Sequence, residues 1–278
     1  MKEGLLFGGL SPTNKKINSL RTLRLCGKNS ILDRNDVRYA IARDIIKKMR
    51  IENMLKELIE KAGGRTALSE HEVKGLLKEM GFSVPNGRFF PAGEMIPENL
   101  DLNYPLVAKV SSENISAKSD LHGVRIGLQD EVELRAAVED ILRIENAEGV
   151  LIEEMAPRGV EVIIGGVLDR QFGPIVMFGL GGIFIELFRD VSFGLAPLNK
   201  DDAHWMISEI KGRRLLEGYR GNPPVDREVL VEILISVSEI MATGLVAEID
   251  LNPVTLYAEG AMVLDAKLKL RSAVLQKP

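Results

Sequence analysis

Cysteine is almost absent from this sequence, since Cys26 is the only one in 278 residues. One cysteine cannot form a disulfide within the chain, and it cannot supply a metal site built from several thiolates. Proteins of oxidising compartments commonly rely on disulfides. The shortage therefore favours a reducing compartment, and we expect a cytoplasmic protein.

Long apolar runs are missing as well. No stretch approaches the roughly 20 apolar residues that a membrane-spanning helix needs, and the first residues lack the apolar core and cleavage site of a signal peptide. The formal net charge of -4, with 45% hydrophobic residues, is typical of a globular protein without general affinity for polyanions. Neither a membrane nor a nucleic acid is an expected partner.

The common motifs for nucleotide binding and for hydrolysis are also absent. No glycine-rich run ends in Gly-Lys-Ser/Thr, and no Gly-x-Gly-x-x-Gly follows an expected strand, which excludes P-loop and Rossmann sites. No nucleophile elbow or Ser/His/Asp order appears. The three histidines, His71, His122 and His204, are too dispersed for a sequence-readable metal site. A ligand would therefore have to be held by side chains scattered along the chain.

Basic residues are concentrated at the start of the chain. Residues 1–50 contain 12 Lys and Arg against 4 Asp and Glu, whereas the remainder contains 24 against 36. This start could be an arm that binds a polyanion. The composition fits better a poorly ordered extension, or a chain start that was wrongly placed upstream of Met54. We therefore expect residues 1–53 to be an extension and residues 54–278 to be the folded domain.

Apolar periodicity and turn residues predict two lobes within that domain. The small lobe covers about 88–155, and the large lobe covers about 66–87 plus 156–278. Helices are expected from Met54 to Gly63, from the capping box of Ser69 and Glu72 to Gly81, and over 130–144, 201–210 and 226–241. Strands are expected at 106–110, 123–128, 150–155, 160–168, 173–178, 182–187, 246–257 and 261–268. The fold class is α+β.

The last expected hairpin brings two oxygen-bearing side chains together. With a two-residue turn at Ala258-Glu259, Asn252 lies directly opposite Asp265, with Cβ atoms about 5 Å apart. A turn centred one residue later makes them diagonal neighbours on the same face. Two such donors can hold Mg²⁺, whose other ligands are water and phosphate. A turn-stabilising asparagine and a surface aspartate remain the alternative. The same face carries further carboxylates, at Glu248 and Asp250.

Four other charged side chains stand at strand ends or in loops. Lys109 ends an apolar strand, so its ammonium could contact a phosphate or simply reach water at the sheet rim. Lys118 lies in a loop, where lysines are usually solvated. Glu153 and Glu161 flank the Pro157 turn, and either could accept from a ribose hydroxyl or face solvent. None of the four identifies a site alone.

A glycine-rich loop follows the expected strand at 173–178. Gly179, Gly181 and Gly182 could let backbone amides approach a phosphate or an oxyanion. A tight turn between two strands is the common alternative.

Seven short motifs occur in order along the chain: Ser69-Glu70-His71-Glu72, Val107-Ala108-Lys109, Gln171-Phe172-Gly173-Pro174, Phe178-Gly179-Leu180-Gly181-Gly182, Asp190-Val191-Ser192-Phe193, Leu195-Ala196-Pro197-Leu198 and Glu248-Ile249-Asp250-Leu251-Asn252-Pro253-Val254. Together they resemble the β subunit of ADP-forming acetyl-CoA synthetase and, more distantly, the nucleotide-binding subunit of succinyl-CoA synthetase. The resemblance runs from about Met54 to the end. Seven motifs in order are far more specific than any one of them.

The resemblance implies an ATP-grasp fold of two α+β subdomains, with the nucleotide in the cleft between them. It implies a ligase reaction in which acyl-CoA, phosphate and ADP reversibly yield acid, CoA and ATP, with Mg²⁺ as cofactor. The phosphoryl group would pass through an acyl phosphate and a phosphohistidine on a partner, the CoA-binding α subunit. This chain would act at the nucleotide end, and catalysis would be positioning plus charge neutralisation.

The same resemblance assigns roles by motif position. Lys109 and Lys118 look like phosphate ligands, the latter in the nucleotide-binding loop Ser116-Ala117-Lys118. Glu153 and Glu161 look like groups lining the nucleoside pocket. Asn252 with Asp265 looks like the Mg²⁺ pair. Gly179, Gly181 and Gly182 resemble the loop that receives the phosphohistidine, with amides acting as oxyanion donors.

Two positions depart from the family pattern. The family usually has His where this chain has Ala117, and that His has been proposed to relay the phosphoryl group. His122 could substitute as a catalytic group, although a surface loop histidine is the simpler interpretation. Arg is usual where this chain has Gly194. A diverged subunit that binds nucleotide without a phosphoryl relay is therefore a second hypothesis. A stand-alone ATP-grasp carboxylate ligase is a third, but no acceptor site is evident.

Overall fold

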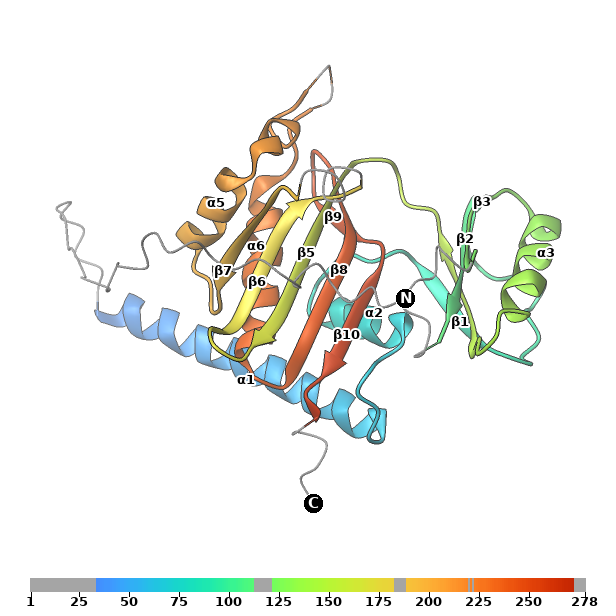
Figure 1. Ribbon diagram of the computed structural model, residues 1–278, viewed down its shortest axis with the longest axis horizontal. Helices are drawn as coiled ribbons and strands as arrows, with labels where there is room; N and C mark the ends of the chain where they lie inside the picture. The colour runs from blue at the N-terminus through green and yellow to red at the C-terminus, as the bar shows by residue number, and fades with distance from the viewer. Residues whose placement is uncertain (1–33, 113–121, 183–188, 220, 222, 273–278) are drawn as a thin grey trace. The chain divides into compact units, whose positions relative to one another are not determined.

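The first element, α1, starts well before the predicted position. The computed structural model describes residues 34–112, 122–182, 189–219, 221 and 223–272 (Figure 1). Within it, α1 runs over Arg34–Ala62 instead of starting at Met54. Ile51, Leu55 and Ala62 are buried, and their spacing places them on one face of the helix. Residues 34–53 are thus helical, which corrects the expected helix start at Met54, whereas the division into an extension and a folded domain stays a prediction.

A four-stranded antiparallel sheet carries the first group of candidate residues. Its strand order is β1-β4-β2-β3, with β1 at Gly87–Pro91, β4 at Gly149–Glu154, β2 at Leu106–Ser111 and β3 at Val124–Leu128. Helix α3, Glu131–Leu142, is capped by Asp130, which accepts from the Glu133 amide at 2.9 Å. Its apolar face packs in a core with Phe90 and Leu106. This part has the α+β composition expected of the small lobe.

A six-stranded antiparallel sheet carries the second group. Its strand order is β10-β8-β5-β6-β7, and β9 also pairs with β8. The strands are β5 at Val160–Asp169, β6 at Gly173–Leu180, β7 at Val191–Leu195, β8 at Val246–Leu256, β9 at Ala261–Val263 and β10 at Ala266–Leu270. Strand β6 thus pairs with β5 and with β7, and the sequence did not predict β7. The strand expected at 182–187 falls almost wholly outside the described residues.

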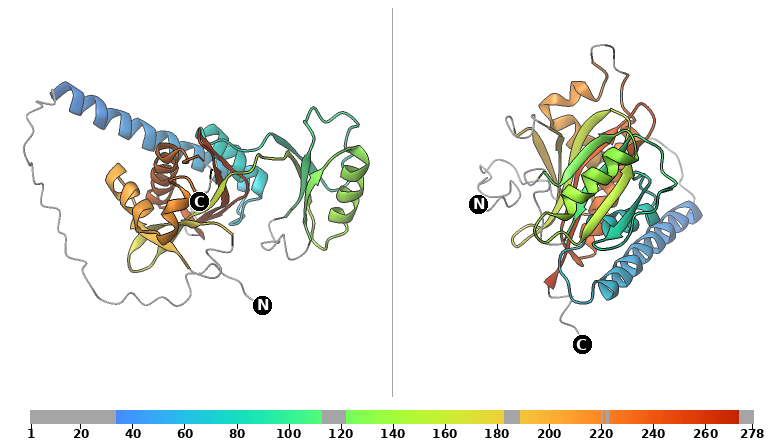
Figure 2. Two further views of the ribbon diagram at one scale, coloured as in Figure 1. Left: turned by 90° about the horizontal axis from the view of Figure 1, so that it is seen from above. Right: turned by 90° about the vertical axis from the view of Figure 1, so that its right-hand side faces the viewer.

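Helices cover one face of this six-stranded sheet. Helix α6, Arg227–Ala242, packs against β5, β6 and β8, and α5, Lys200–Glu209, packs against β7 (Figures 1 and 2). A 3-10 turn, Lys211–Leu215, follows α5. Helix α2, Glu70–Glu79, packs against β10. In the part of the chain that the structure describes, no helix combines the length and apolar character needed to cross a bilayer.

Candidate functional site

The hairpin of β8 with β9 and β10 has the register predicted for a turn at Ala258-Glu259. Val254 pairs with Val263, and Leu251 pairs with Ala266. Asn252 and Asp265 lie between these pairs, and the Asn252 amide donates to the Asp265 carbonyl oxygen at 3.1 Å. The two residues are therefore directly opposite each other. The register is confirmed, while their binding of Mg²⁺ stays a prediction.

Asp250 adds a partly buried carboxylate two residues before Asn252. Its Oδ1 atom is buried and has no hydrogen-bond partner among the described residues. Burial raises the pKa of Asp250 to about 6, although the charge of Lys267 opposes the increase. A buried carboxylate oxygen without a donor is costly unless a cation compensates it. Asp250 was noted in the sequence only as part of an acidic face, and its burial was not foreseeable.

These oxygens suit a magnesium ion. Mg²⁺ binds one or two protein carboxylates and keeps several waters or phosphate oxygens, so a site need not gather many acidic side chains. Among the described residues no group of three His, Cys, Asp or Glu side chains could hold a metal ion by itself. The donors of Asn252 and Asp265, with the orphaned oxygen of Asp250 nearby on β8, fit an ion that shares its coordination with a nucleotide.

Lys109 was predicted to end its strand, but β2 continues to Ser111. Its ammonium is enclosed by protein groups. The Nζ atom lies 2.8 Å from the carboxylate of Glu70, 2.8 Å from that of Glu153 and 2.6 Å from the Leu264 carbonyl oxygen. Burial acts to lower the pKa of Lys109, yet the charges of Glu70 and Glu153 outweigh it and raise that pKa above its ordinary value. Lys109 is therefore a charged lysine whose three donors already have acceptors.

A second lysine, Lys74, belongs to the same group. Its Nζ atom lies 2.7 Å from Glu70, 2.5 Å from Glu153 and 2.7 Å from the Leu264 carbonyl oxygen. Burial, with the positive charge of Lys109 beside it, lowers the pKa of Lys74 despite the attraction of Glu70. The sequence analysis assigned no role to Glu70 or Lys74. Glu70 lies in one of the seven motifs, but the only signal that joins it to Lys74 is the i, i+4 spacing of opposite charges, which is typical of exposed helix faces.

The two glutamates expected near the nucleoside occupy different environments. Both carboxylate oxygens of Glu153 already accept from lysines, Oε1 from Lys74 and Oε2 from Lys109. A ribose hydroxyl would have to compete for them. Glu161 is exposed at the start of β5, so its side chain is accessible. A role in nucleoside binding stays a prediction for both.

The glycine loop after β6 approaches β5 closely. A Cβ atom on Gly181 would lie 3.0 Å from that of Glu161, and the Gly181 amide donates to the Glu161 carbonyl oxygen at 2.8 Å. Gly179 lies within β6, opposite Ile163. Gly182 is exposed and has a φ of +61°, which favours glycine. Of the three amides, that of Gly181 is thus already used, and a contact of this loop with a phosphohistidine stays a prediction.

Three of the predicted residues cannot be located. Ser116, Ala117 and Lys118 lie outside the described residues. His122 is exposed, has a φ of +52°, and its carbonyl oxygen accepts from Arg125. A catalytic role for His122 stays a prediction.

Gly194 has a packing reason to lack a side chain. A Cβ atom there would lie 2.7 Å from Leu198 and 2.7 Å from Met206. Its side-chain direction therefore points into the helical layer that covers the sheet. The neighbouring residues of β7, Phe193 and Leu195, are exposed. An arginine at this position would require this layer to move.

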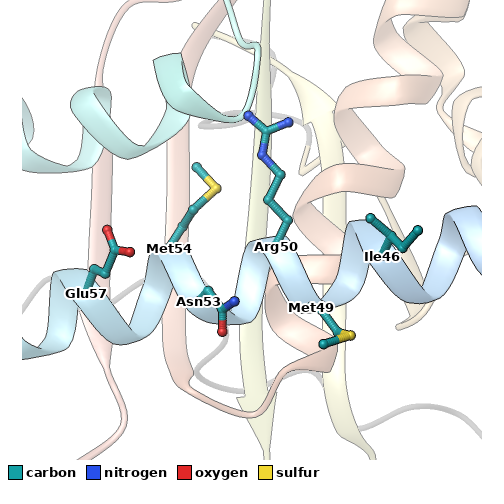
Figure 3. Close-up of a pocket in the computed structure, with 6 residues that line it drawn as sticks. All are labelled: Ile46, Met49, Arg50, Asn53, Met54 and Glu57. Carbon is teal, nitrogen blue, oxygen red and sulfur yellow. The ribbon is translucent and has the colours of Figure 1, made fainter.

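A hollow on α1 is separate from all these residues. It is lined by side chains of a single helix: Ile46, Met49, Arg50, Asn53, Met54 and Glu57 (Figure 3). Arg50 also donates to the carbonyl oxygen of Glu79 at the end of α2. None of the predicted site residues lines this hollow, so it does not represent the nucleotide site.

The family described as "ATP-grasp domain" matches residues 59–270 of this chain. Among curated relatives, the β subunit of acetate–CoA ligase (ADP-forming) I from Pyrococcus furiosus is 40% identical over 244 residues. The aligned region covers 84% of this chain and 99% of that subunit.

Solved structures of the same kind of enzyme are also similar to this chain. Acetyl-coenzyme A synthetase 1 from Candidatus Korarchaeum cryptofilum, in complex with coenzyme A and Ca-AMPCP, is 43% identical with a TM-score of 0.72. The match covers 78% of this chain and 99% of that one. A second structure of that enzyme, with coenzyme A and Mg-AMPPCP, is 45% identical with a TM-score of 0.68 and coverages of 78% and 100%. In that structure a phosphohistidine segment points towards the nucleotide binding site.

Proposed function

We propose a function from the premise that this chain belongs to the ATP-grasp family and is similar over most of its length to β subunits of ADP-forming acetate–CoA ligases. It is the nucleotide-binding subunit of an NDP-forming acyl-CoA synthetase. The enzyme converts acyl-CoA, ADP and phosphate into acid, CoA and ATP, and it also runs in reverse. The partner is an α subunit that binds CoA and carries the histidine that is phosphorylated.

The observation that carries this proposal is the pairing of Asn252 with Asp265 across the last hairpin. Their backbones are held together by a hydrogen bond of 3.1 Å, so the two residues are held opposite each other before any ligand binds. The buried Oδ1 atom of Asp250 lies two residues away on the same strand without a partner among the described residues. Preorganised oxygen donors of this kind favour Mg²⁺ with a nucleotide phosphate.

The residues of this chain would bind the nucleotide and its Mg²⁺, orient the phosphates and neutralise their charge. Magnesium bound with the nucleotide would supply positive charge at the phosphate oxygens, which is the main requirement of phosphoryl transfer. Asn252 and Asp265 would hold that ion. Lys109 would contribute positive potential at the phosphates, although direct contact requires it to exchange one of its present acceptors. Glu161 and Glu153 would lie on the nucleoside side, and the amides near Gly182 would face the incoming phosphoryl group.

The test is reconstitution with the candidate α subunit. The full chain and its partner are co-expressed, and ATP formation is measured with ADP, phosphate and a series of acyl-CoAs. The proposal expects ATP only when all three substrates and Mg²⁺ are present. Acyl preference should follow the α subunit when partners are exchanged. ATP formation by the complex without phosphate or without acyl-CoA would contradict the proposed reaction.

A second candidate function is favoured by Ala117. A subunit that lacks a histidine there could bind nucleotide and partner without relaying phosphate. Ala117→His distinguishes the two functions in the same reconstituted assay. A large gain of rate from a negligible starting rate would support a lost relay. Full activity of the unsubstituted chain would exclude the second candidate.

A further inference from the structure

We propose that Glu70 and Lys74 of α2 are positioning residues for the magnesium ligand Asp265. With Lys109 and Glu153 they form an ion cluster that holds the peptide group immediately before Asp265. The inference rests on the proposed function, because it concerns how this chain presents that ligand to Mg²⁺ and a nucleotide.

The cluster is buried and balanced in charge. Its four side chains are at most 10% exposed, and it contains two ammonium and two carboxylate groups. All four lysine–carboxylate distances lie between 2.5 and 2.8 Å. A balanced set of this kind avoids an uncompensated buried charge, which would be strongly destabilising. The cluster is therefore a stable unit of the folded protein.

The lysines also share one backbone acceptor. Lys109 donates to the Leu264 carbonyl oxygen at 2.6 Å, and Lys74 donates to the same oxygen at 2.7 Å. An ammonium has three donors and a carbonyl oxygen has two lone pairs. Each lysine thus uses its donors on Glu70, Glu153 and this carbonyl, and the carbonyl is saturated. The orientation of the Leu264 carbonyl is fixed by two charged donors.

Fixing this carbonyl fixes the peptide plane that leads into Asp265, because the peptide group is planar. The other side of the same segment is held by β8. The Leu264 amide donates to the Pro253 carbonyl oxygen at 2.9 Å, and the Asp265 carbonyl oxygen accepts from Asn252 at 3.1 Å. Asp265 is therefore held from both sides, by β8 and by the cluster.

Helix α2 is itself anchored to β10, so the cluster is not attached to a free element. The Leu68 amide donates to the Leu268 carbonyl oxygen at 3.2 Å, and the Leu270 amide donates to the Thr66 carbonyl oxygen at 2.7 Å. At the start of α2 the Ser69 amide donates to the Glu72 carboxylate at 2.9 Å. The segment that leads into α2 is therefore hydrogen-bonded to β10, the strand that follows Asp265.

The experiment compares metal binding by the full chain and by Lys74→Met. Calorimetric titration gives the affinity for Mg²⁺ in the presence of saturating ADP, and a second titration with chelator gives the affinity for ADP alone. Groups that orient metal ligands typically change metal affinity by about 10- to 100-fold when removed. We expect Lys74→Met to weaken Mg²⁺ binding by at least about tenfold, with metal-free ADP affinity within about twofold of wild type.

The matched control is Arg135→Met, which also removes one cation from an ion pair on a helix. Arg135 pairs with Glu131 on the exposed face of α3, where both side chains are 47% exposed. The affinity of the Arg135→Met variant for Mg²⁺ should equal that of the unsubstituted chain. The double variant Glu70→Gln with Lys74→Met keeps the cluster balanced in charge, and it should fold while still binding Mg²⁺ weakly.

The outcomes separate this inference from the proposed function. An unsubstituted chain that binds neither ADP nor Mg²⁺ overturns the proposed function and the inference with it. A chain that binds both, with unchanged Mg²⁺ affinity in folded Lys74→Met, overturns the inference alone. Equal losses of Mg²⁺ and metal-free ADP affinity, or unfolding of both the single and the double variant, would assign the cluster a purely structural role.

Discussion

Lys74 and Lys109, from a helix and a strand far apart in the sequence, donate to the same carbonyl oxygen of Leu264 at 2.7 and 2.6 Å. Two like charges can share one acceptor here because Glu70 and Glu153 each contact both ammonium groups. The arrangement converts four buried charges into a neutral support for the β9–β10 segment.

Removing one lysine from the ion cluster should lower the free energy of unfolding. Lys109→Met leaves two buried carboxylates with one ammonium, and removing one partner of a buried pair commonly costs about 3–5 kcal/mol. We expect the free energy of unfolding in urea to fall by about that amount. Lys269→Met removes an ion pair with Glu248 in which the lysine is 59% exposed, and it should cost less than about 1 kcal/mol. Similar small losses in both variants would contradict the account of the cluster.

Asp250 gives a prediction about pH. Its folded pKa of about 6 lies above that of an unfolded aspartate, which is about 3.9. Between these values the native state binds more protons, so the free energy of unfolding of the metal-free chain falls as pH rises. Asp250→Asn should remove this fall, which amounts to at most about 3 kcal/mol. Urea unfolding with chelator at pH 4 and pH 7 measures it. Parallel pH profiles of the two proteins would contradict the prediction.

Glu72 gives a pH effect of opposite sign. Burial acts to raise its pKa, but hydrogen bonds from Arg65 and Ser69 outweigh it and lower the pKa of Glu72 to about 2. Its contribution is present above the unfolded pKa and is lost as pH falls towards 2. Glu72→Gln should cost about 1 kcal/mol at pH 7, since the group is half-buried and water still screens part of its charge, and little at pH 2. An equal cost at both values would mean that the carboxylate charge is irrelevant.

Two glycines make a paired test of packing. A Cβ atom at Gly194 would lie 2.7 Å from both Leu198 and Met206, whereas one at Gly75 in α2 meets nothing within 4 Å. Gly194→Ala should destabilise the fold by about 1–3 kcal/mol through overpacking. Gly75→Ala should stabilise it by about 0.5–1 kcal/mol through helix propensity. Thermal unfolding of both variants checks the signs, and stabilisation by Gly194→Ala would be the contrary result.

Local sequence signals predicted the parts of the site that depend on neighbouring residues. The register of the last hairpin follows from its turn, which is why Asn252 and Asp265 could be placed opposite each other. The capping box at Ser69 likewise located the start of α2. The resemblance to a family supplied the chemistry, which no spacing implied.

The parts of the fold and of the site that the sequence did not predict depend on contacts between distant segments. The cluster joins Lys74 with Lys109, Glu153 and Leu264, and no periodicity connects these positions. Strand β7 was missed because its pattern becomes evident only when it pairs with β6. The first half of α1 was missed because its basic composition resembles that of a solvated extension.

The central claim is that the hairpin pair binds magnesium with a nucleotide, and Asp265→Asn tests it most directly. The full chain is titrated with Mg²⁺ at saturating ADP, and the same two proteins are assayed with the α subunit. The account predicts that the substitution lowers Mg²⁺ affinity by at least about tenfold and abolishes ATP formation while the fold is retained. Unchanged Mg²⁺ affinity and full activity in the variant would contradict it.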